Sequence, residues 1–216
     1  PGDTYANRMP DPVLQQVEQF NNPSTTANDA FKPVTRYFDR ITRPEQIIQS
    51  FPIAVQTMLD PADCGPACIS LSQDIQGQTF DYPAEFFQEK VHTIRRPRPD
   101  EFQIKEAADK IKSSKNPIII SGGGVFYSDA MEELSQFAIK HNIPVTQTVM
   151  GYSTMKRDHS HFAGQIGGLG GKNTNTLAKE TDLAIAVGTK LADFTTGSWA
   201  NFENENFKLV SINVSR

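Results

Sequence analysis

The chain has 216 residues and a mass of 24.0 kDa, enough for one large domain or two small ones. Its 21 Lys and Arg residues against 25 Asp and Glu residues give a formal net charge of −4, which argues against a nucleic-acid partner because phosphate binding needs a basic stripe. Apolar runs such as Leu183–Val187 are far shorter than the ~20 residues of a membrane span, so we expect a soluble protein. Because the chain begins at Pro1 without a methionine, we interpret it as an internal piece of a longer protein.

The segment from residue 42 to residue 71 predicts a helix followed by a strand. Thr42-Arg43-Pro44-Glu45 has the pattern of a capping box with proline in the first turn. Apolar residues then recur every three or four positions from Ile47 to Met58, which indicates one buried helical face, and Pro52 is expected to kink it. Ala67–Leu71 predicts a short strand. We expect no strand before this helix, as if a sheet had been cut.

Residues 77–101 lack hydrophobic periodicity and contain the run Arg95-Arg96-Pro97-Arg98-Pro99, which is typical of an extended linker. We therefore predict one domain at residues 1–80, a linker at 81–100 and a second domain at 101–216.

After the linker, helices and apolar strands alternate, which predicts an α/β fold with a doubly wound parallel sheet covered on both faces. The first helix is expected to bury Phe102 and Ile104, and residues 151–171 are expected to form a long loop. Asp129 is expected to cap a later helix. The predicted helices are 101–113, one from 129 and 173–180, and the predicted strands are 117–121, 143–146, 183–187 and 207–214.

Two glycine clusters are candidate ligand sites. Gly122-Gly123-Gly124 follows a predicted strand, where a doubly wound sheet binds phosphate, but Tyr127 stands where the dinucleotide fingerprint needs its third glycine. A plain tight turn therefore stays an alternative. Gly164–Lys172 departs from a P-loop at Ile166 and Asn173. Its glycines indicate that a ligand, a neighbouring subunit or the chain itself comes close to this backbone.

The sequence predicts no metal site and no nucleophile–base arrangement. Cys64 and Cys68 are separated by three residues, a spacing that fits neither a zinc half-site nor a thioredoxin motif. We interpret them as packing residues of a protein from a reducing, cytoplasmic compartment. His159 and His161 are interpreted as polar loop residues.

Several stretches occur together in a characteristic order: Asp29–Lys32, Thr42–Ile47, Asn116–Gly124, Asn142–Gly151 and Val187–Gly197. In register, they resemble the thiamine-diphosphate enzymes close to acetohydroxyacid synthase and glyoxylate carboligase. The resemblance implies that residues 1–80 are the C-terminal part of the pyrimidine-binding domain. It also implies that residues 101–216 are the central Rossmann-like domain, truncated at its C-terminal end.

The resemblance implies thiamine diphosphate and Mg²⁺ as cofactors of a homo-oligomeric full-length enzyme. The activating glutamate and the Gly-Asp-Gly motif of the family are not in this chain, so we expect no catalytic residue and no activity in this piece alone. Gly2–Ala6 and Tyr152–Arg157 are most similar to family members that break a C–C bond in a cyclic polyol diketone during inositol catabolism. The alternatives are a carboligase of the acetolactate synthase or glyoxylate carboligase type, and a non-catalytic nucleotide-binding module.

The resemblance also suggests which residues line sites. Phe31 and Lys32 stand where the synthases place a Phe-Gln pair on a loop that reaches a neighbouring subunit's cofactor, so they are candidate active-site lining; an exposed loop lysine is the alternative. Specific flavin contacts of the synthases are altered, so we expect a structural domain without FAD and at most a remnant nucleotide crevice. The candidate crevice residues are Gly122, Gly123, Gly124, Gly167, Gly168, Lys190 and Asp193.

Overall fold

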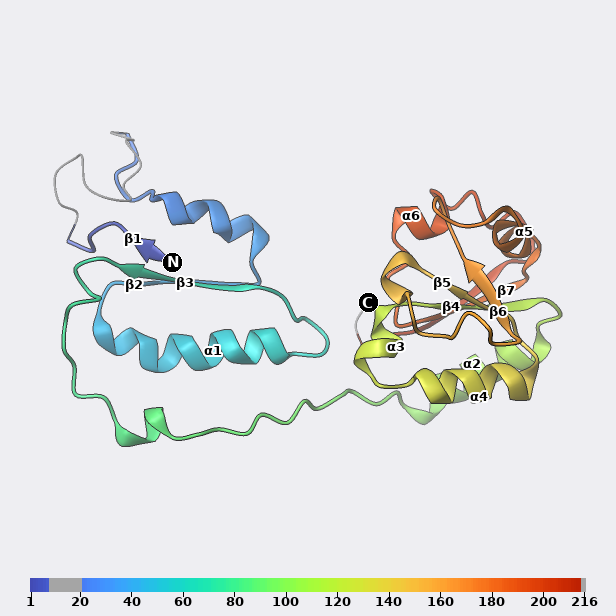
Figure 1. Ribbon diagram of the computed structural model, residues 1–216, viewed down its shortest axis with the longest axis horizontal. Helices are drawn as coiled ribbons and strands as arrows, with labels where there is room; N and C mark the ends of the chain where they lie inside the picture. Colours follow the sequence, from blue (N-terminus) through green and yellow to red (C-terminus); the bar gives the residue numbers. More distant parts are fainter. Residues whose placement is uncertain (8–20, 215–216) are drawn as a thin grey trace. The chain divides into compact units, whose positions relative to one another are not determined.

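The computed structural model describes residues 1–7 and 21–214 (Figure 1). The chain divides into two compact units, Pro1–Arg96 (unit 1) and Pro97–Arg216 (unit 2). Each unit is built on a parallel sheet with helices packed against it, which confirms the predicted α/β class. Within the described part of the chain, no helix has the length and apolar character needed to cross a membrane.

Unit 1 contains a three-stranded parallel sheet in the order β1-β3-β2, formed by β1 (Gly2–Asp3), β2 (Tyr37–Ile41) and β3 (Ala67–Ser72). Helix α1 (Ile47–Leu59) covers one face and the 3-10 helix η1 (Ala27–Val34) the other (Figure 1). The expectation that no strand precedes α1 was wrong, because β2 pairs with β3 along its whole length. The sequence of β2 contains Asp39 and Arg40 and therefore has no apolar run, so the strand was missed. Both side chains are half-buried, and Arg40 pairs with Asp3 of the same unit.

The start of α1 also differs from the predicted capping box. A 3-10 turn, η2 (Pro44–Gln46), precedes the helix, and the acceptor is Gln46 rather than Glu45. Gln46 Oε1 accepts hydrogen bonds from the backbone N–H groups of Thr42 at 2.7 Å and Arg43 at 3.0 Å. The capping pattern is therefore real but is shifted by one residue, and α1 continues without a break through Pro52.

The segment between the two sheets holds one short element, η3 (Ala84–Phe87). Tyr82 stacks on Phe86 with ring centroids 5.8 Å apart, and its hydroxyl donates to Pro44 O at 3.2 Å, so the first part of this segment packs on unit 1. The boundary between the units, after Arg96, lies inside the segment 81–100.

Unit 2 has five parallel strands in the order β6-β5-β4-β7-β8. From β4, the next two strands along the chain are added on one side of the sheet and β7 and β8 on the other. The pair β4 and β7 is therefore the switch point of a doubly wound fold. The strands are β4 (Pro117–Ser121), β5 (Val145–Gln147), β6 (Phe162–Gln165), β7 (Leu183–Val187) and β8 (Lys208–Ile212). The helices are α2 (Glu101–Ser113), α3 (Gly123–Tyr127), α4 (Met131–His141), α5 (Lys172–Glu180) and α6 (Asp193–Thr196).

Both faces of this sheet are covered, as predicted. Leu134 and Ala138 of α4, with Ala107 and Ile111 of α2, belong to the core on one face. Ala178 of α5 belongs to the core on the other face (Figure 1). Ile118, Ile119 and Ile120 of β4 are almost completely buried because successive side chains of this central strand enter opposite cores.

Strand β6 lies within the segment 151–171, where we expected only a loop. It is an edge strand with half-buried side chains, and its register with β5 shifts between Val145 and Thr146. Gly164 within it has φ +100°. Such an irregular edge strand has neither an apolar run nor strict alternation, so sequence periodicity could not find it.

Two predicted helix features were also wrong. Phe102 and Ile104 of α2 are 76% and 53% exposed, so the buried face of α2 is narrower than its apolar pattern indicated. Asp129 does not cap α4, because it has φ +54° and the N-cap position is occupied by Ala130.

Candidate functional site

The carboxyl ends of β4 and β7 meet at the switch point of unit 2, where a doubly wound sheet usually binds its ligand. Gly122 N donates to Val187 O at 2.8 Å and Gly124 N donates to Gly188 O at 2.9 Å. A Cβ atom on Gly122 would lie 2.3 Å from Gly188 O. The turn after β4 therefore lies directly against the turn after β7, and glycine is needed for that approach.

The second predicted glycine cluster reaches the same edge of the sheet. Gly167 N donates to Asn175 Oδ1 at 2.9 Å, and Gly168 N donates to Phe194 O at 2.8 Å. A Cβ atom on Gly167 would lie 2.0 Å from that carbonyl oxygen, and Gly167 has φ +95°. The structure thus brings the cluster against the segment that follows β7.

The two charged crevice candidates lie on the surface. Lys190 is exposed. Asp193, the first residue of α6, is also exposed, and its Oδ1 accepts a hydrogen bond from Ser198 Oγ at 2.8 Å. The Asp193 side chain therefore fastens the turn after α6.

Most glycine N–H groups at this end of the sheet have acceptors within the chain. A phosphate cradle needs backbone N–H groups that point at the ligand. Seven glycine N–H groups of the two clusters and the turn after β7 instead donate to acceptors within the chain. They belong to Gly122, Gly124, Gly167, Gly168, Gly170, Gly171 and Gly188. The chain approaches itself closely at Gly122, Gly124, Gly167, Gly170 and Gly188, where an added Cβ would lie less than 3.0 Å from backbone atoms.

Phe31 and Lys32 lie on η1 in unit 1. Phe31 is 44% exposed, whereas Lys32 Nζ forms an ion pair with Asp29 Oδ1 at 2.9 Å and lies 5.3 Å from the centre of the Phe38 ring. Lys32 is thus held by two residues of its own unit.

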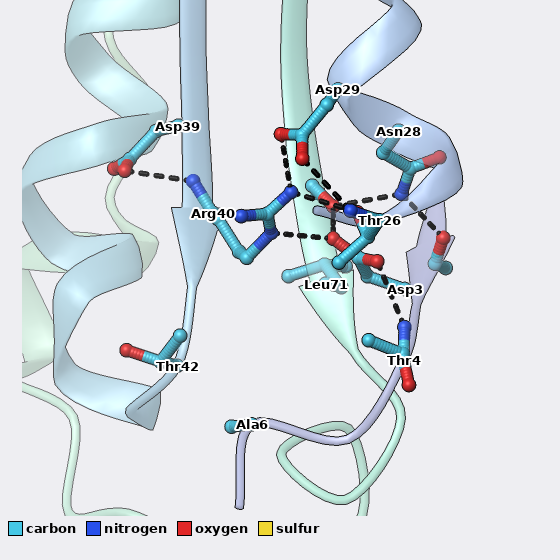
Figure 2. Close-up of polar contacts among 12 residues, drawn as sticks. Asp3, Thr4, Ala6, Thr26, Asn28, Asp29, Asp39, Arg40, Thr42 and Leu71 are labelled. Carbon is cyan, nitrogen blue, oxygen red and sulfur yellow. Dashed lines mark hydrogen bonds and ion pairs between the residues drawn. The ribbon is translucent and has the colours of Figure 1, made fainter. Parts of the chain in front are cut away.

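Asp29 also belongs to a polar cluster that sequence reasoning missed and that we call the Arg40 network (Figure 2). The Arg40 guanidinium on β2 donates through Nε to Asp3 Oδ2 and through Nη2 to Asp29 Oδ1, each at 2.7 Å. Asp3 on β1 is completely buried. The network consists of Thr26, Asn28 and Asp29 at the start of η1 and of Asp3, Arg40 and Ser70 on the three strands of the sheet.

The remaining contacts tie η1 to the sheet. Arg40 Nη2 also donates to Thr26 Oγ1 at 2.7 Å, and Thr26 N donates to Asp29 Oδ2 at 2.8 Å. Asn28 Nδ2 donates to Ser70 Oγ at 2.8 Å, and Ser70 Oγ donates to Asp3 Oδ2 at 2.5 Å. A buried charge such as that of Asp3 is stable only when it is paired and hydrogen-bonded, as it is here.

The pKa values in the Arg40 network follow from these contacts. Burial alone raises the pKa of Asp29, but the Thr26 N–H and the Lys32 and Arg40 cations outweigh it and lower the pKa to about 2. Burial likewise opposes ionisation of Asp3, yet hydrogen bonds from Ser70 and Arg40 hold its pKa below the ordinary value. Both carboxylates are therefore ionised throughout the neutral and mildly acidic range.

We expect unit 1 to lose stability as the pH falls from about 4 to about 2. The folded pKa of Asp29 lies below its unfolded value of 3.8, so its contribution is complete above pH 4 and is lost as the carboxylate is protonated. The shift corresponds to about 2 kcal/mol. Urea unfolding of the wild type and of Asp29→Asn, followed by the NMR signals of β2 and β3, measures the difference at each pH.

Asp63→Asn is the matched control, because Asp63 pairs with Arg36 on the exposed surface of the same unit. The stability difference between wild type and Asp29→Asn should shrink toward zero by pH 2. A difference that stays constant from pH 5 to pH 2 contradicts the assignment.

Comparison with known proteins places this architecture in a family. The sequence model described as "Thiamine pyrophosphate enzyme, central domain" matches residues 104–216, which is more than half of the chain and coincides with unit 2 except for its first residues. The chain belongs to the thiamine pyrophosphate enzyme family. The family resemblance predicted from the sequence is confirmed.

Three similar relatives of this thiamine pyrophosphate enzyme chain carry the same enzyme name. Over all 216 residues it is 48% identical to the 3D-(3,5/4)-trihydroxycyclohexane-1,2-dione hydrolases of Clostridium perfringens and Halalkalibacterium halodurans. It is 46% identical over 215 residues to hydrolase 1 of this name from Bacillus cereus. The chain spans about a third of the length of these curated relatives, 34% for the first two and 33% for the third.

The described residues form no cluster of side chains that would hold the Mg²⁺ of the family. A diphosphate held through Mg²⁺ needs carboxylate and carbonyl oxygens gathered at one place. In residues 1–7 and 21–214, no three His, Cys, Asp or Glu side chains gather in an arrangement that holds a metal ion. His159 Nδ1 accepts from His161 N at 3.1 Å and His159 Nε2 bonds to Ser135 Oγ at 2.9 Å, so this ring serves the fold.

Proposed function

We propose that the intact protein hydrolyses a C–C bond of trihydroxycyclohexane-1,2-dione in inositol catabolism, with thiamine diphosphate and Mg²⁺ bound outside the present chain. The observation that carries the proposal is identity of 46–48% to hydrolases of this name along the whole chain. The proposed reaction adds water across the bond between the two adjacent carbonyl carbons. One carbon becomes a carboxylate and the other an aldehyde, and the ring opens.

In this proposal, the 216 residues are a scaffold of a cytoplasmic homo-oligomer. Residues 1–80 belong to the pyrimidine-binding domain and residues 101–216 to the central domain. The exposed ring of Phe31 lines the active site of a neighbouring subunit, and Lys32 supports it through its contact with Asp29.

The test is an assay of the intact protein with thiamine diphosphate, Mg²⁺ and the cyclic diketone. We expect an open-chain acid as the product and no turnover by the 216-residue chain alone. Because a displaced lining residue misorients the substrate, Phe31→Ala in the intact protein should lower turnover about tenfold or more without changing assembly.

Two outcomes contradict the proposal. Turnover by the isolated 216 residues shows that the catalytic groups lie within them. Formation of acetolactate from pyruvate, with no hydrolysis of the diketone, identifies a carboligase instead.

We further propose that unit 2 has a structural role and binds no flavin or other dinucleotide. This proposal is supported by seven glycine N–H groups that donate hydrogen bonds to acceptors within the chain. They lie at the end of the sheet where a doubly wound fold binds a diphosphate. Titration of the chain with FAD, ADP and NAD, followed by flavin fluorescence and calorimetry, should give no saturation at micromolar concentration. Saturable micromolar binding of any of the three contradicts this role and favours a nucleotide-binding module.

A further inference from the structure

A small hollow lies beside the segment that follows β5, separate from the glycine turns. Its volume is about 230 Å³. We call it the Lys156–Arg157 pocket, and it is lined by Gln147, Tyr152, Ser153, Met155, Lys156 and Arg157. None of these residues was a candidate in the crevice predicted from the sequence.

Buried hydrogen bonds fix the inner wall of this pocket. Gln147, at the end of β5, is buried and donates through Nε2 to Met155 O at 3.0 Å. Thr154 is buried behind it, and its Oγ1 lies 2.7 Å from both Ser121 Oγ on β4 and Gly151 O. The segment that forms the pocket is therefore hydrogen-bonded to β4 and β5. These bonds form this wall of the pocket without a ligand.

The outer rim is cationic. Arg157 Nη2 donates to the Tyr152 hydroxyl at 3.1 Å, and its guanidinium lies 5.5 Å from the centre of the Tyr152 ring. These contacts hold the guanidinium in place. The adjacent Lys156 adds a second positive charge, and no carboxylate is among the lining residues.

The backbone at the rim is strained. Ser153 has φ +70°, a conformation that residues other than glycine rarely adopt. Strain of this kind persists where the surrounding contacts impose it, and it is concentrated at ligand sites. In a chain with a net charge of −4, two cations beside a strained turn and a buried amide form a local site for negative charge.

We propose that the Lys156–Arg157 pocket binds a small oxyanion, either a carboxylate or a phosphate. Its volume is below the roughly 300–1,000 Å³ of sites for drug-sized ligands, so a dinucleotide does not fit inside it. The Arg157 fork and the Lys156 ammonium supply charge-assisted hydrogen bonds to the anion. The exposed hydroxyl groups of Tyr152 and Ser153 can hydrogen-bond to hydroxyl groups of the same ligand.

The test is calorimetric titration of the 216-residue chain at low ionic strength with two probes, inorganic phosphate and gluconate. We expect saturable 1:1 binding of at least one probe, and the tighter one identifies the ligand chemistry. Lys156→Gln/Arg157→Gln should weaken binding at least tenfold. Both side chains are exposed, so this variant should keep the circular dichroism spectrum of the wild type.

Lys115→Gln/Lys140→Gln is the matched control, since it also removes two exposed positive charges from the same unit. It should bind the probe with unchanged affinity. Equal loss of affinity in Lys115→Gln/Lys140→Gln shows non-specific attraction and overturns the proposal. Wild-type affinity in Lys156→Gln/Arg157→Gln overturns it too, as does the failure of both probes to saturate the wild type. None of these outcomes depends on the activity of the intact enzyme.

Discussion

Replacing Arg40 by methionine should lower the free energy of unfolding of unit 1 by about 3–5 kcal/mol, because removing one partner of a buried ion pair leaves the other charge unpaired. Arg40 contacts Asp3, which is completely buried, and Asp29, whose contacts link η1 to the sheet. Methionine keeps much of the apolar stem of the side chain, so the loss reports the guanidinium contacts rather than a cavity.

The two cysteines provide a local measurement of this loss. Both lie in unit 1: Cys68 is buried in β3, and Cys64 is exposed. The chain has two units, so a single unfolding curve does not describe it, and a local probe is required. The rate of thiol labelling at Cys68 should rise about hundredfold or more in Arg40→Met, while labelling at Cys64 stays fast in both proteins.

Arg43→Met is the control, because Arg43 pairs with Glu45 at the protein surface. Its effect should stay below about 1 kcal/mol. Adding Asp3→Asn to Arg40→Met removes the stranded charge and should restore part of the lost stability. Equal effects of Arg40→Met and Arg43→Met, or no recovery in the double variant, contradict the assigned role of the Arg40 network.

Replacing Gly167 by alanine should cost unit 2 about 3 kcal/mol or more. Two causes act together. The new Cβ would lie 2.0 Å from Phe194 O, which is fixed backbone, and φ +95° is strained for any residue with a side chain. The turn must therefore shift, and the hydrogen bond from Gly168 N to Phe194 O weakens with it.

The single tryptophan of the chain, Trp199, lies in unit 2 just after α6, so its fluorescence during urea unfolding reports this unit alone. Gly168→Ala is the matched control in the adjacent position. Its Cβ would meet nothing closer than Phe194 Cδ1 at 3.7 Å, and Gly168 does not have the positive φ of Gly167. Its effect should be within about 1 kcal/mol. An unchanged unfolding midpoint in Gly167→Ala contradicts the close approach seen in the structure.

Apolar strands at the centre of the second sheet were predictable because both of their faces are buried. Pro117–Ser121 and Leu183–Val187 read as continuous apolar runs, and the structure places both at their predicted bounds. Edge strands were not predictable. Phe162–Gln165 and Tyr37–Ile41 are half-buried and are paired through polar or irregular contacts, so their sequences resemble loops.

At the candidate site, features set by neighbouring residues were predictable, whereas contacts between distant parts of the sequence were not. Glycines in the turns marked the places where backbones approach each other, but the sequence could not specify that the approaching group is another turn. The Arg40 network joins residues 26, 28 and 29 of one turn to residues 3, 40 and 70, which lie on three different strands. No local spacing connects that turn to the three strands.

Strand β8 has a pairing partner on one side only among the described strands, and Leu209 and Ile212 on it are 38% and 49% exposed. An open strand edge with apolar side chains is a template for adding a further strand. Preparations of the 216-residue chain should therefore oligomerise as the protein concentration rises. A charged residue in place of Ile212 should keep them monomeric, whereas changes in the first sheet should not.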